Sequence, residues 1–428
     1  MKTKRFGQPH ITIALFLAVL FGLGAAFLLL PDRGFSAHEN RYLAQAPKVT
    51  VETILSGDMT RDAENYINDQ FPLRDRWIVC QAALSRAAGR RDNNGVYFGK
   101  DHTLIETFWT YDKERFLKNT AAVQKYAQEA TAAGGEVYFV PVPNASEVNR
   151  HLLLPFAPDQ SQAALIKAAE ETVTTQPALL SSQSDSQTAV TVNTLAALND
   201  QALSGRQLYY RTDHHMTTEG TFIVYQQLLQ AMGLTPYSED DFERTAVTDR
   251  FRGTLYNKSG AWWTPVDTID RWDLKDAAGS NAAGDSGNTA GLSATVTILP
   301  SGKQYDTMYN EEALSGSDPY AYFLYGNQPL VVIKTGAAAG DGTKTSNGKT
   351  GGQSDSSSTR KLLLIKDSYA HELVPFLACH FDEIHMIDLR YYHDSIKAYR
   401  EANGIGTTVI LYNVKNFCED EYVPLITR

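Results

Sequence analysis

Two short segments contain the residue types that can activate a serine. TDHHMTTEG carries Asp213, His214 and His215 just before an expected helix, and KDSYAHE places Ser368 directly after the apolar run LLLI. A serine hydroxyl is a weak nucleophile at neutral pH unless an imidazole accepts its proton and a carboxylate orients that imidazole. Asp213 and His215 are two residues apart, so both can lie on one side of an extended turn. The pattern predicts an acyl-transfer triad of Ser368, His215 and Asp213.

Both motifs also have a purely structural explanation. Asp and Thr are favoured N-caps, so an Asp-His-His run before a helix can be capping and surface polarity. Ser368 can cap a helix that begins near Ala370, although the backbone N–H groups of that helix would also stabilise an oxyanion. Asp, His and Glu are metal ligands as well. Because HxxxH and HxH spacings are missing, we expect no metal, and no motif predicts a cofactor.

Polar residues follow several expected strands. The C-terminal part alternates apolar strands with helices, which is typical of a parallel sheet covered on both faces. Reactive groups gather at the carboxyl ends of such strands. We expect five strand ends to meet at one edge, with polar groups from Ser368, Arg390, Asn413, Asn144 and the Asp-His-His run after LYY. Asn144 and Asn413 are candidate oxyanion donors beside the Ser368 N–H.

Further side chains are candidates for substrate contact. Arg390 and Tyr391 can clamp a carboxylate and stack on a sugar ring, although Arg390 can equally form a structural ion pair. His214 points away from the expected triad and is either structural or in contact with substrate. Trp262 and Trp263 suggest a carbohydrate-facing surface, or ordinary packing. These aromatic residues support an alternative hypothesis in which the protein binds glycans without catalysis.

The N-terminus predicts the location of the protein. The stretch ITIALFLAVLFGLGAAFLLL (11–30) is apolar, uncharged and long enough to cross a bilayer. Basic residues precede it, which places residues 1–10 in the cytoplasm and the C-terminal domain outside, as a single-pass protein of the cell membrane. A cleaved signal peptide is the alternative. The net charge of −10 argues against nucleic acid as a partner, and three scattered cysteines give no disulfide framework.

The remaining chain is expected to form a stalk and one elaborated domain. Expected elements include helices over 58–89, 111–133 and 218–232, a hairpin over 93–106, a strand over 136–144 and a polar loop over 179–189. The expected division is a cytoplasmic tail at 1–10, a membrane anchor at 11–30, a stalk and entry segment at 31–110, and an α/β domain at 111–428 with an insertion at about 235–330 and a disordered loop at 336–359.

Several of these motifs together resemble the DHHW family of exported bacterial proteins. The segments that carry the resemblance are TDHHMTTEG, KDSYAHELVPFLACHF, IHMIDLRYY and VILYNV, with HENRYLAQAP and VYFGKDHTLIE upstream. One residue departs from the family pattern, since the tryptophan after Asp-His-His is Met216 here. The DHHW family is similar to SGNH hydrolase-like proteins of bacterial polysaccharide O-acetylation, such as the alginate O-acetyltransferases.

The resemblance implies both a fold and a function. It implies a flavodoxin-like, three-layer α/β/α domain with a parallel sheet, preceded by an N-terminal transmembrane helix. It implies Asp213 as the orienting acid, His215 as the base and Ser368 as the nucleophile. It also implies an envelope glycan as substrate and a membrane-bound O-acyltransferase as partner. The resulting hypothesis is an extracytoplasmic serine acyltransferase or esterase for a cell-envelope polysaccharide; the alternative is a catalytically inactive glycan-binding or scaffold protein. Transferase and hydrolase stay open, because water exclusion depends on loop closure.

Overall fold

The chain divides into two compact units. The computed structural model describes residues 8–36, 41–174, 189–275, 292–335 and 359–428. One unit holds residues 1–94 and 257–262, and the other holds 95–256 and 263–428. This division falls earlier in the chain than the boundary at 110 expected from the sequence. The predictions of soft loops at 276–291 and 336–358, and of the polar loop up to residue 188, lie outside the described residues.

The first unit begins with an apolar helix. Helix α1 (Gln8–Leu29) includes 20 residues, His10–Leu29, with a mean hydropathy of 2.6. Among the described residues it alone is long and apolar enough to cross a membrane, and a signal sequence would meet the same criteria. The helical prediction over 58–89 is confirmed, with a break at Pro72. The other elements are β1 (Phe35–Ser36), β2 (Arg41–Tyr42), α2 (Val51–Ser56), α3 (Asp58–Gln70), α4 (Arg74–Ala87) and β3 (Asp92–Asn93).

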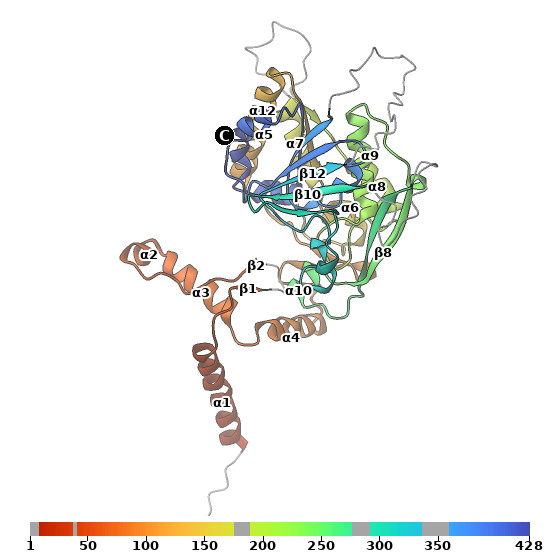
Figure 1. Cartoon of the computed structure of the whole chain (residues 1–428). Coiled ribbons are helices and arrows are strands. Elements are labelled where there is room, and N and C mark those ends of the chain that lie inside the picture. The colour runs from red at the N-terminus through yellow and green to blue at the C-terminus, as the bar shows by residue number, and fades with distance from the viewer. Residues whose placement is uncertain (1–7, 37–40, 175–188, 276–291, 336–358) are drawn as a thin grey trace, which may run out of the picture. The chain divides into compact units, whose positions relative to one another are not determined.

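The second unit is built around an eight-stranded mixed sheet. Its strand order is β11-β10-β12-β14-β13-β15-β6-β7. Strands β10 and β12 of this sheet are labelled in Figure 1. Strands β14, β13, β15, β6 and β7 are parallel, whereas β12, β10 and β11 are antiparallel. The α/β class is therefore confirmed, but the sheet is not parallel throughout. Part of the expected insertion, residues 294–305, supplies β10 and β11 at the sheet edge. The strands are β6 (Glu136–Val142), β7 (Val190–Thr191), β10 (Ala294–Leu299), β11 (Lys303–Tyr305), β12 (Leu330–Thr335), β13 (Lys361–Lys366), β14 (Glu383–Ile387) and β15 (Thr407–Asn413).

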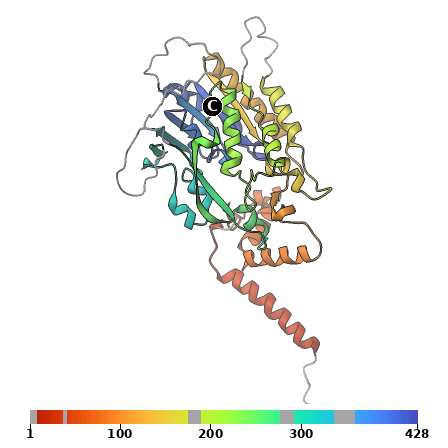
Figure 2. The same cartoon turned by 90° about the vertical axis from the view of Figure 1, so that its right-hand side faces the viewer.

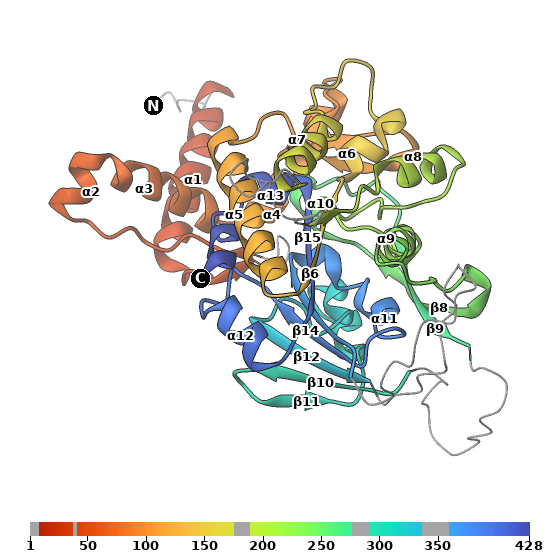
Figure 3. The ribbon, with the colours of Figure 1, turned by 90° about the horizontal axis from the view of Figure 1, so that it is seen from above.

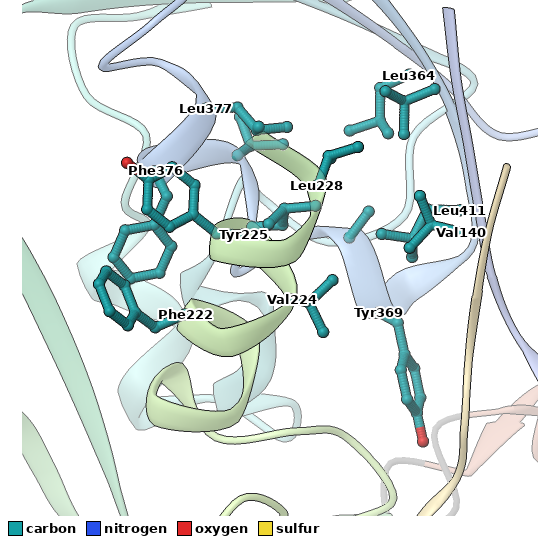
Figure 4. Packing of buried hydrophobic residues seen from close by; sticks show 14 of the residues in the cluster. Val140, Phe222, Val224, Tyr225, Leu228, Leu364, Tyr369, Phe376, Leu377 and Leu411 are labelled. Atoms are coloured by element: carbon teal, nitrogen blue, oxygen red, sulfur yellow. The ribbon is translucent and has the colours of Figure 1, made fainter. Parts of the chain in front are cut away.

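Helices cover both faces of this sheet. Alternate residues of a strand point to opposite faces, so Leu362 and Leu364 of β13 join one apolar cluster while Leu363 and Ile365 join the other. The sheet seen from above has α5 and α12 on one side and α9 and α11 on the other (Figure 3). In the close view, aromatic and aliphatic residues of α9 pack between the strands and Phe376 (Figure 4). The covering helices are α5 (Lys113–Ala132), α6 (Ala145–Val148), α7 (Gln162–Thr174), α8 (Leu195–Leu203), α9 (Thr218–Ala231), α11 (Val374–Leu377), α12 (Ile396–Ala402) and α13 (Val414–Glu419).

The remaining elements lie outside the layers. Strands β8 (Phe242–Phe251) and β9 (Asp267–Leu274) pair as a long antiparallel ribbon, drawn green in Figures 1 and 2. The hairpin expected over 93–106 contains β4 (Val96–Phe98) paired with β5 (Leu104–Glu106). The shorter helices are η1 (Lys100–His102), η2 (Arg150–Leu152), η4 (Glu239–Asp241), α10 (Thr254–Ser259), η5 (Glu311–Ser315), η6 (Pro319–Tyr322), η7 (Ser368–Ala370) and η8 (Val423–Thr427).

Two local predictions near the Asp-His-His and Ser368 motifs were wrong. The expected strand LYY is not a strand of the sheet, because Tyr209 forms only an isolated bridge with Met216 as the chain folds back on itself. The expected helix over AHELVPFLACHF is interrupted. A single 3₁₀ turn, η7, begins at Ser368, and the short α11 follows with Pro375 in its first turn. Proline fits that position because it has no N–H to donate.

Candidate active site

Ser368 sits on a turn that its preceding aspartate fixes. Strand β13 ends at Lys366, and the carboxylate of Asp367 accepts the N–H of Tyr369 at 3.0 Å. Its other oxygen accepts the backbone N–H and side-chain amide of Asn413, both at 2.8 Å, and the amide of Asn416 at 3.2 Å. Asp367 therefore ties the end of β13 to the end of β15. Among the residues that the structure describes, none accepts a hydrogen bond from the Ser368 N–H.

The Asp-His-His run lies in a closed turn rather than after a strand. The turn is closed by hydrogen bonds from Tyr210 N to His215 O at 3.2 Å and from Thr217 N to Leu208 O at 3.0 Å. Asp267, the first residue of β9, accepts Thr212 N at 2.8 Å and Thr212 Oγ1 at 2.6 Å. These bonds fix the turn on two sides, so the imidazoles enter the site from a rigid loop.

The structure brings the three predicted triad residues together. Asp213 Oδ1 lies 2.6 Å from His215 Nδ1 and also accepts the His215 backbone N–H at 2.9 Å. His215 Nε2 lies 2.7 Å from Ser368 Oγ. If Nδ1 carries the imidazole hydrogen and donates it to Asp213, Nε2 is left as an acceptor for the serine hydroxyl. This geometry is the one that a serine nucleophile and its base require.

The far side of the Asp213 carboxylate is held by a segment distant in sequence. Oδ2 accepts the backbone N–H of Thr254 at 2.6 Å and its hydroxyl at 3.0 Å. Gly253 lies so close that a Cβ at that position would be 2.2 Å from Asp213 Oδ2. A contact that short does not occur between real atoms, so a side chain at Gly253 would have to displace the carboxylate. The absence of a side chain at Gly253 is thus a condition of the Asp213 position.

Burial and charge set the protonation states of this group. Burial alone would raise the pKa of Asp213, but the neighbouring imidazoles of His214 and His215 and the hydrogen bonds to the carboxylate hold it well below its usual range. Burial, with the neighbouring His214, lowers the pKa of His215 to about 4 against the opposing effect of Asp213. At neutral pH the aspartate is therefore charged and His215 is neutral, as a general base must be.

Tyr369 couples the Asp-His-His turn to the sheet. Its hydroxyl donates to the carbonyl of His214 at 2.5 Å and accepts from Asn144 Nδ2 at 3.1 Å. In Figure 4 the ring of Tyr369 leaves the apolar cluster with its hydroxyl pointing away from it. Because Tyr369 directly follows Ser368, this link fixes the serine and the turn that carries His215 in one network.

A small polar pocket opens beside Ser368. Its volume is about 150 Å³. Five of the predicted site residues line it, together with Glu106, Lys415, Asn416 and Glu419; the five are Ser368, His214, Asn144, Asn413 and Arg390. The two asparagines differ in what they can offer. Asn144 uses both amide hydrogens, on Tyr369 and on Asn413 Oδ1 at 3.0 Å, whereas Asn413 gives one to Asp367 and keeps the other.

The two predicted substrate-binding residues after β14 have different surroundings. Arg390 forms a bidentate pair with Asp388, with Nε 2.9 Å from Oδ1 and Nη2 2.6 Å from Oδ2. Asp388 also accepts from the buried ammonium of Lys366 at 3.1 Å. Tyr391 is half-exposed beside Arg390 and does not line the pocket. The structural interpretation of Arg390 as an ion pair is thus confirmed, although its side chain reaches the pocket wall.

The tryptophans named in the sequence analysis lie in different units. Trp262 belongs to the first unit and is 59% exposed. Trp263 belongs to the second, where its ring packs edge-on against Phe98 with 5.1 Å between centroids. The two adjacent residues therefore do not form one aromatic surface within either unit.

Sequence reasoning missed several residues that hold the site. An Asn-x-x-Asn spacing after β15 is the one signal that was available, because Asn413 caps α13 and so places Asn416 beside it. Lys366 and Asp388 lie inside the motifs KDSYAHE and IHMIDLRYY but were not singled out, and the residues from segments without a recognisable motif are Asp267, Thr254 and Tyr320.

Asp213, His214 and His215 are also metal-ligand types, and their potential ligand atoms lie within 4.8 Å of one another. Within the described part of the chain, five of the six potential ligand atoms already form hydrogen bonds, the exception being His214 Nε2. His214 Nδ1 lies 2.7 Å from Thr254 Oγ1, and both nitrogens of His215 and both oxygens of Asp213 are occupied. A cation at this position would have to replace the bond between His215 and Asp213 or Ser368.

Comparison with known proteins supports the α/β fold and the resemblance to proteins of polysaccharide O-acetylation. Residues 100–284 match the family model of the SGNH hydrolase-like domain of the acetyltransferase AlgX. Over that stretch the chain resembles an SGNH hydrolase-like domain. Over 230 residues the chain is 25% identical to the probable alginate O-acetylase AlgJ of Pseudomonas fluorescens. That match covers 51% of this chain and about half the length, 51%, of the relative.

Solved structures show the same fold. A DHHW family protein from Eubacterium siraeum matches 78% of this chain and 95% of its own, with a TM-score of 0.58 and 18% identity. PatB1 from Bacillus cereus, solved with a sulfonyl adduct, matches 77% and 97%, with a TM-score of 0.56 and 18% identity. The relationship to these groups that the sequence motifs predicted is confirmed.

Proposed function

We propose that this protein is an envelope-associated O-acetyltransferase that modifies a polysaccharide through a serine nucleophile. The observation that carries the proposal is the hydrogen-bonded series Asp213–His215–Ser368, with distances of 2.6 and 2.7 Å, beside a polar pocket. The relationship to AlgX and AlgJ supports acetyl as the group and a polysaccharide as the acceptor. The apolar helix α1 supports an anchor or exported location.

The proposed reaction has two halves. His215 Nε2 takes the proton of Ser368 Oγ while the oxygen attacks the acetyl carbonyl, and the donor's C–O bond breaks as its oxygen receives that proton. In the second half, His215 takes the proton of a sugar hydroxyl, which attacks the acetyl-enzyme and releases Ser368 with its proton restored. If water attacks instead, the same steps describe an esterase. Supply of acetyl groups by a membrane-bound O-acyltransferase is part of the proposal.

The oxyanion site is inferred from the N–H groups near Ser368 that have no hydrogen-bond acceptor in the part of the chain that the structure describes. Among the described residues the Ser368 N–H has no acceptor, and Asn413 and Asn416 each give one amide hydrogen to Asp367 and have no acceptor there for the second. We assign the oxyanion to the Ser368 N–H and one of these two amides. Asn144, the other candidate from the sequence, is unsuited in this arrangement because both its amide hydrogens are used.

The test uses the full chain in detergent micelles and a small sulfonyl fluoride, followed by intact-mass analysis. We expect one adduct on the wild type and none on Ser368→Ala. Ser395→Ala is the matched control, because Ser395 also caps a helix, α12, and should keep the adduct. Hydrolysis of 4-nitrophenyl acetate should fall about 10⁴-fold in Ser368→Ala. An unreactive but folded wild type, judged by circular dichroism, would favour the non-catalytic glycan-binding alternative.

The acceptor is tested separately. The chain is incubated with an acetyl donor ester and a panel of neutral and uronate oligosaccharides, and the products are read by mass. Gain of one acetyl mass on a sugar, absent with Ser368→Ala, is the expected result. Release of acetate from acetylated sugars without transfer would assign an esterase instead.

A further inference from the structure

The ring of Tyr320 lies flat against His215. Their centroids are 3.7 Å apart and the planes differ by 10°. The ring of His214 approaches His215 at 3.9 Å with 37° between planes. Two rings at these distances cannot share one face, so the imidazole of His215 is held between them. Tyr320 comes from η6, far in sequence from both triad motifs, and is 5% exposed.

We propose that Tyr320 is a positioning residue, and that its aromatic face both holds the His215 imidazole in the plane of proton transfer and favours the imidazolium formed there. The inference rests on the proposed acyl-transfer function. Nothing in the sequence pattern or in the comparisons marks this tyrosine.

Tyr320 can orient His215 because the hydrogen bonds of His215 leave one rotation of its ring unrestrained. The bonds of His215 to Asp213 and Ser368 run roughly along the line through its two nitrogens. Rotation of the ring about that line would keep both bonds while turning the ring out of its plane. A flat aromatic contact opposes that rotation. The stack therefore supplies the one constraint that the triad's own hydrogen bonds do not.

The electrostatic role follows from the buried setting. An aromatic face attracts a cation, and the attraction is largest where water is excluded. His215 becomes positive whenever it takes the proton of Ser368. Burial raises the pKa of Tyr320 well above its usual range, so the phenol stays neutral and its ring does not carry a competing negative charge. The ring therefore stabilises the charged state of His215 relative to the neutral one.

Other contacts of Tyr320 are weaker. Its hydroxyl lies 3.5 Å from the carbonyl oxygen of Ser368, a long hydrogen bond, and its ring lies 6.2 Å from that of His371. His371 is itself neutral, since burial lowers its pKa, and it accepts from Lys366 Nζ at 2.9 Å. The ring contact with His215 is thus the interaction of Tyr320 that bears on the reaction, and the hydroxyl is secondary.

The test compares three variants of the full chain with 4-nitrophenyl acetate. Tyr320→Leu removes the aromatic face and keeps an apolar side chain, and we expect kcat to fall about ten- to thirtyfold with KM unchanged. Tyr320→Phe keeps the face and should restore kcat to within about twofold. Tyr322→Leu is the matched control. Tyr322 is equally buried in η6, but it stacks on Tyr309 and does not contact the triad.

Each outcome decides between the ring and a general packing role. Equal losses of kcat in Tyr320→Leu and Tyr322→Leu, at matched thermal midpoints, would overturn the inference. So would Tyr320→Phe as slow as Tyr320→Leu, because the hydroxyl would then be the active part. If Tyr320→Leu does not fold, Tyr320→His takes its place, and a kcat equal to that of Tyr320→Phe would then overturn the inference. A wild type whose activity does not depend on Ser368 would contradict the proposed function itself, which is a separate result.

Discussion

The ends of the neighbouring parallel strands β13 and β14 carry similar polar residues in different states. At the end of β14, Asp388 binds Arg390 through two bonds and Lys366 through a third. At the end of β13, Ser368 Oγ lies 2.7 Å from His215 Nε2, and within the described residues its N–H meets no acceptor. At the end of β14 the charged side chains pair with one another, whereas at the end of β13 a backbone N–H without an acceptor among the described residues lies beside the Ser368 hydroxyl.

The difference shows what a polar strand end needs in order to react. A buried ion pair is costly to desolvate and repays that cost only through complete pairing. The pair of Asp388 with two cations meets that condition, and any reaction there would break it. Ser368 and His215 are instead joined by a hydrogen bond, and in the proposed mechanism a proton moves along it without leaving a charge unpaired, because Asp213 would stabilise the imidazolium. The comparison predicts that substitutions at the two ends will affect different properties.

Asp213→Asn should give the largest effect on activity. An amide has one oxygen and one NH₂, so it favours the wrong tautomer of His215 and cannot stabilise the imidazolium. We expect kcat on 4-nitrophenyl acetate to fall about 10⁴-fold with little change in thermal stability. Activity within tenfold of the wild type would mean that Asp213 is a structural cap and that the β13 end does not work as proposed.

Gly253→Ala should act through the same aspartate. Its Cβ would lie 2.2 Å from Asp213 Oδ2, so the carboxylate or the loop must move. A displacement of that order costs about 10²-fold in rate. Gly406→Ala is the control, because a Cβ there meets nothing within 4 Å. Equal rates for the two variants would show that the loop carrying Thr254 adapts freely, and that Asp213 is not held as tightly as its hydrogen bonds indicate.

Asp388→Asn should lower stability far more than activity. Lys366 is 1% exposed and would lose its charge partner, which costs about 3–5 kcal/mol of unfolding free energy. Activity per folded molecule should fall by less than about tenfold, since Ser368 and His215 keep their own partners. Glu129→Gln, which breaks an exposed pair with Lys125, should change stability by less than about 1 kcal/mol. Urea unfolding and activity titration measure both quantities. A large activity loss in a stable variant would make the β14 end part of the reaction.

The sequence predicted the reacting groups better than their supports. Asp213, His215 and Ser368 were recognisable because their types and their place before expected turns match one chemistry. Their hydrogen-bonded arrangement agrees with that prediction, whereas their catalytic role stays a prediction until it is measured. Thr254 and Tyr320 were missed because they come from the stretch that was assigned to an insertion. No periodicity or spacing relates them to either motif.

The wrong predictions for LYY and Asn144 also arose because each depends on contacts with residues distant in sequence. LYY has the composition of a strand, but the tyrosines are buried by a turn that folds back, and β-propensity reflects such burial rather than sheet pairing alone. Asn144 was a reasonable oxyanion donor by position at the end of β6. Whether an amide hydrogen is free depends on which neighbours accept it, and Tyr369 and Asn413 take both. Counting of this kind requires three-dimensional structure.

The smallest expected effect is the change of kcat/KM in mild acid. The residues at the ends of β13 and β14 should again differ, this time in how they respond to pH. Burial lowers the pKa of His215 to about 4, so the base should stay neutral down to about pH 5 and kcat/KM should change by less than about twofold between pH 8 and pH 5. The acid limb should then have its midpoint near pH 4. Asp388 stays ionised through this range, because Lys366 and Arg390 outweigh burial and lower its pKa.

The same shift in the pKa of His215 makes the stability of the protein depend on pH. His215 has a lower pKa folded, about 4, than unfolded, about 6.5, so the unfolded chain takes up the proton first. Its contribution to stability is complete above about pH 6.5 and is lost as the pH falls through 4. Thermal midpoints taken at each pH therefore distinguish loss of the base from unfolding. A rate that halves near pH 6.5 in protein that is still folded would mean that His215 is hydrated like a surface histidine. The proposal that His215 is enclosed between His214 and Tyr320 would then be wrong.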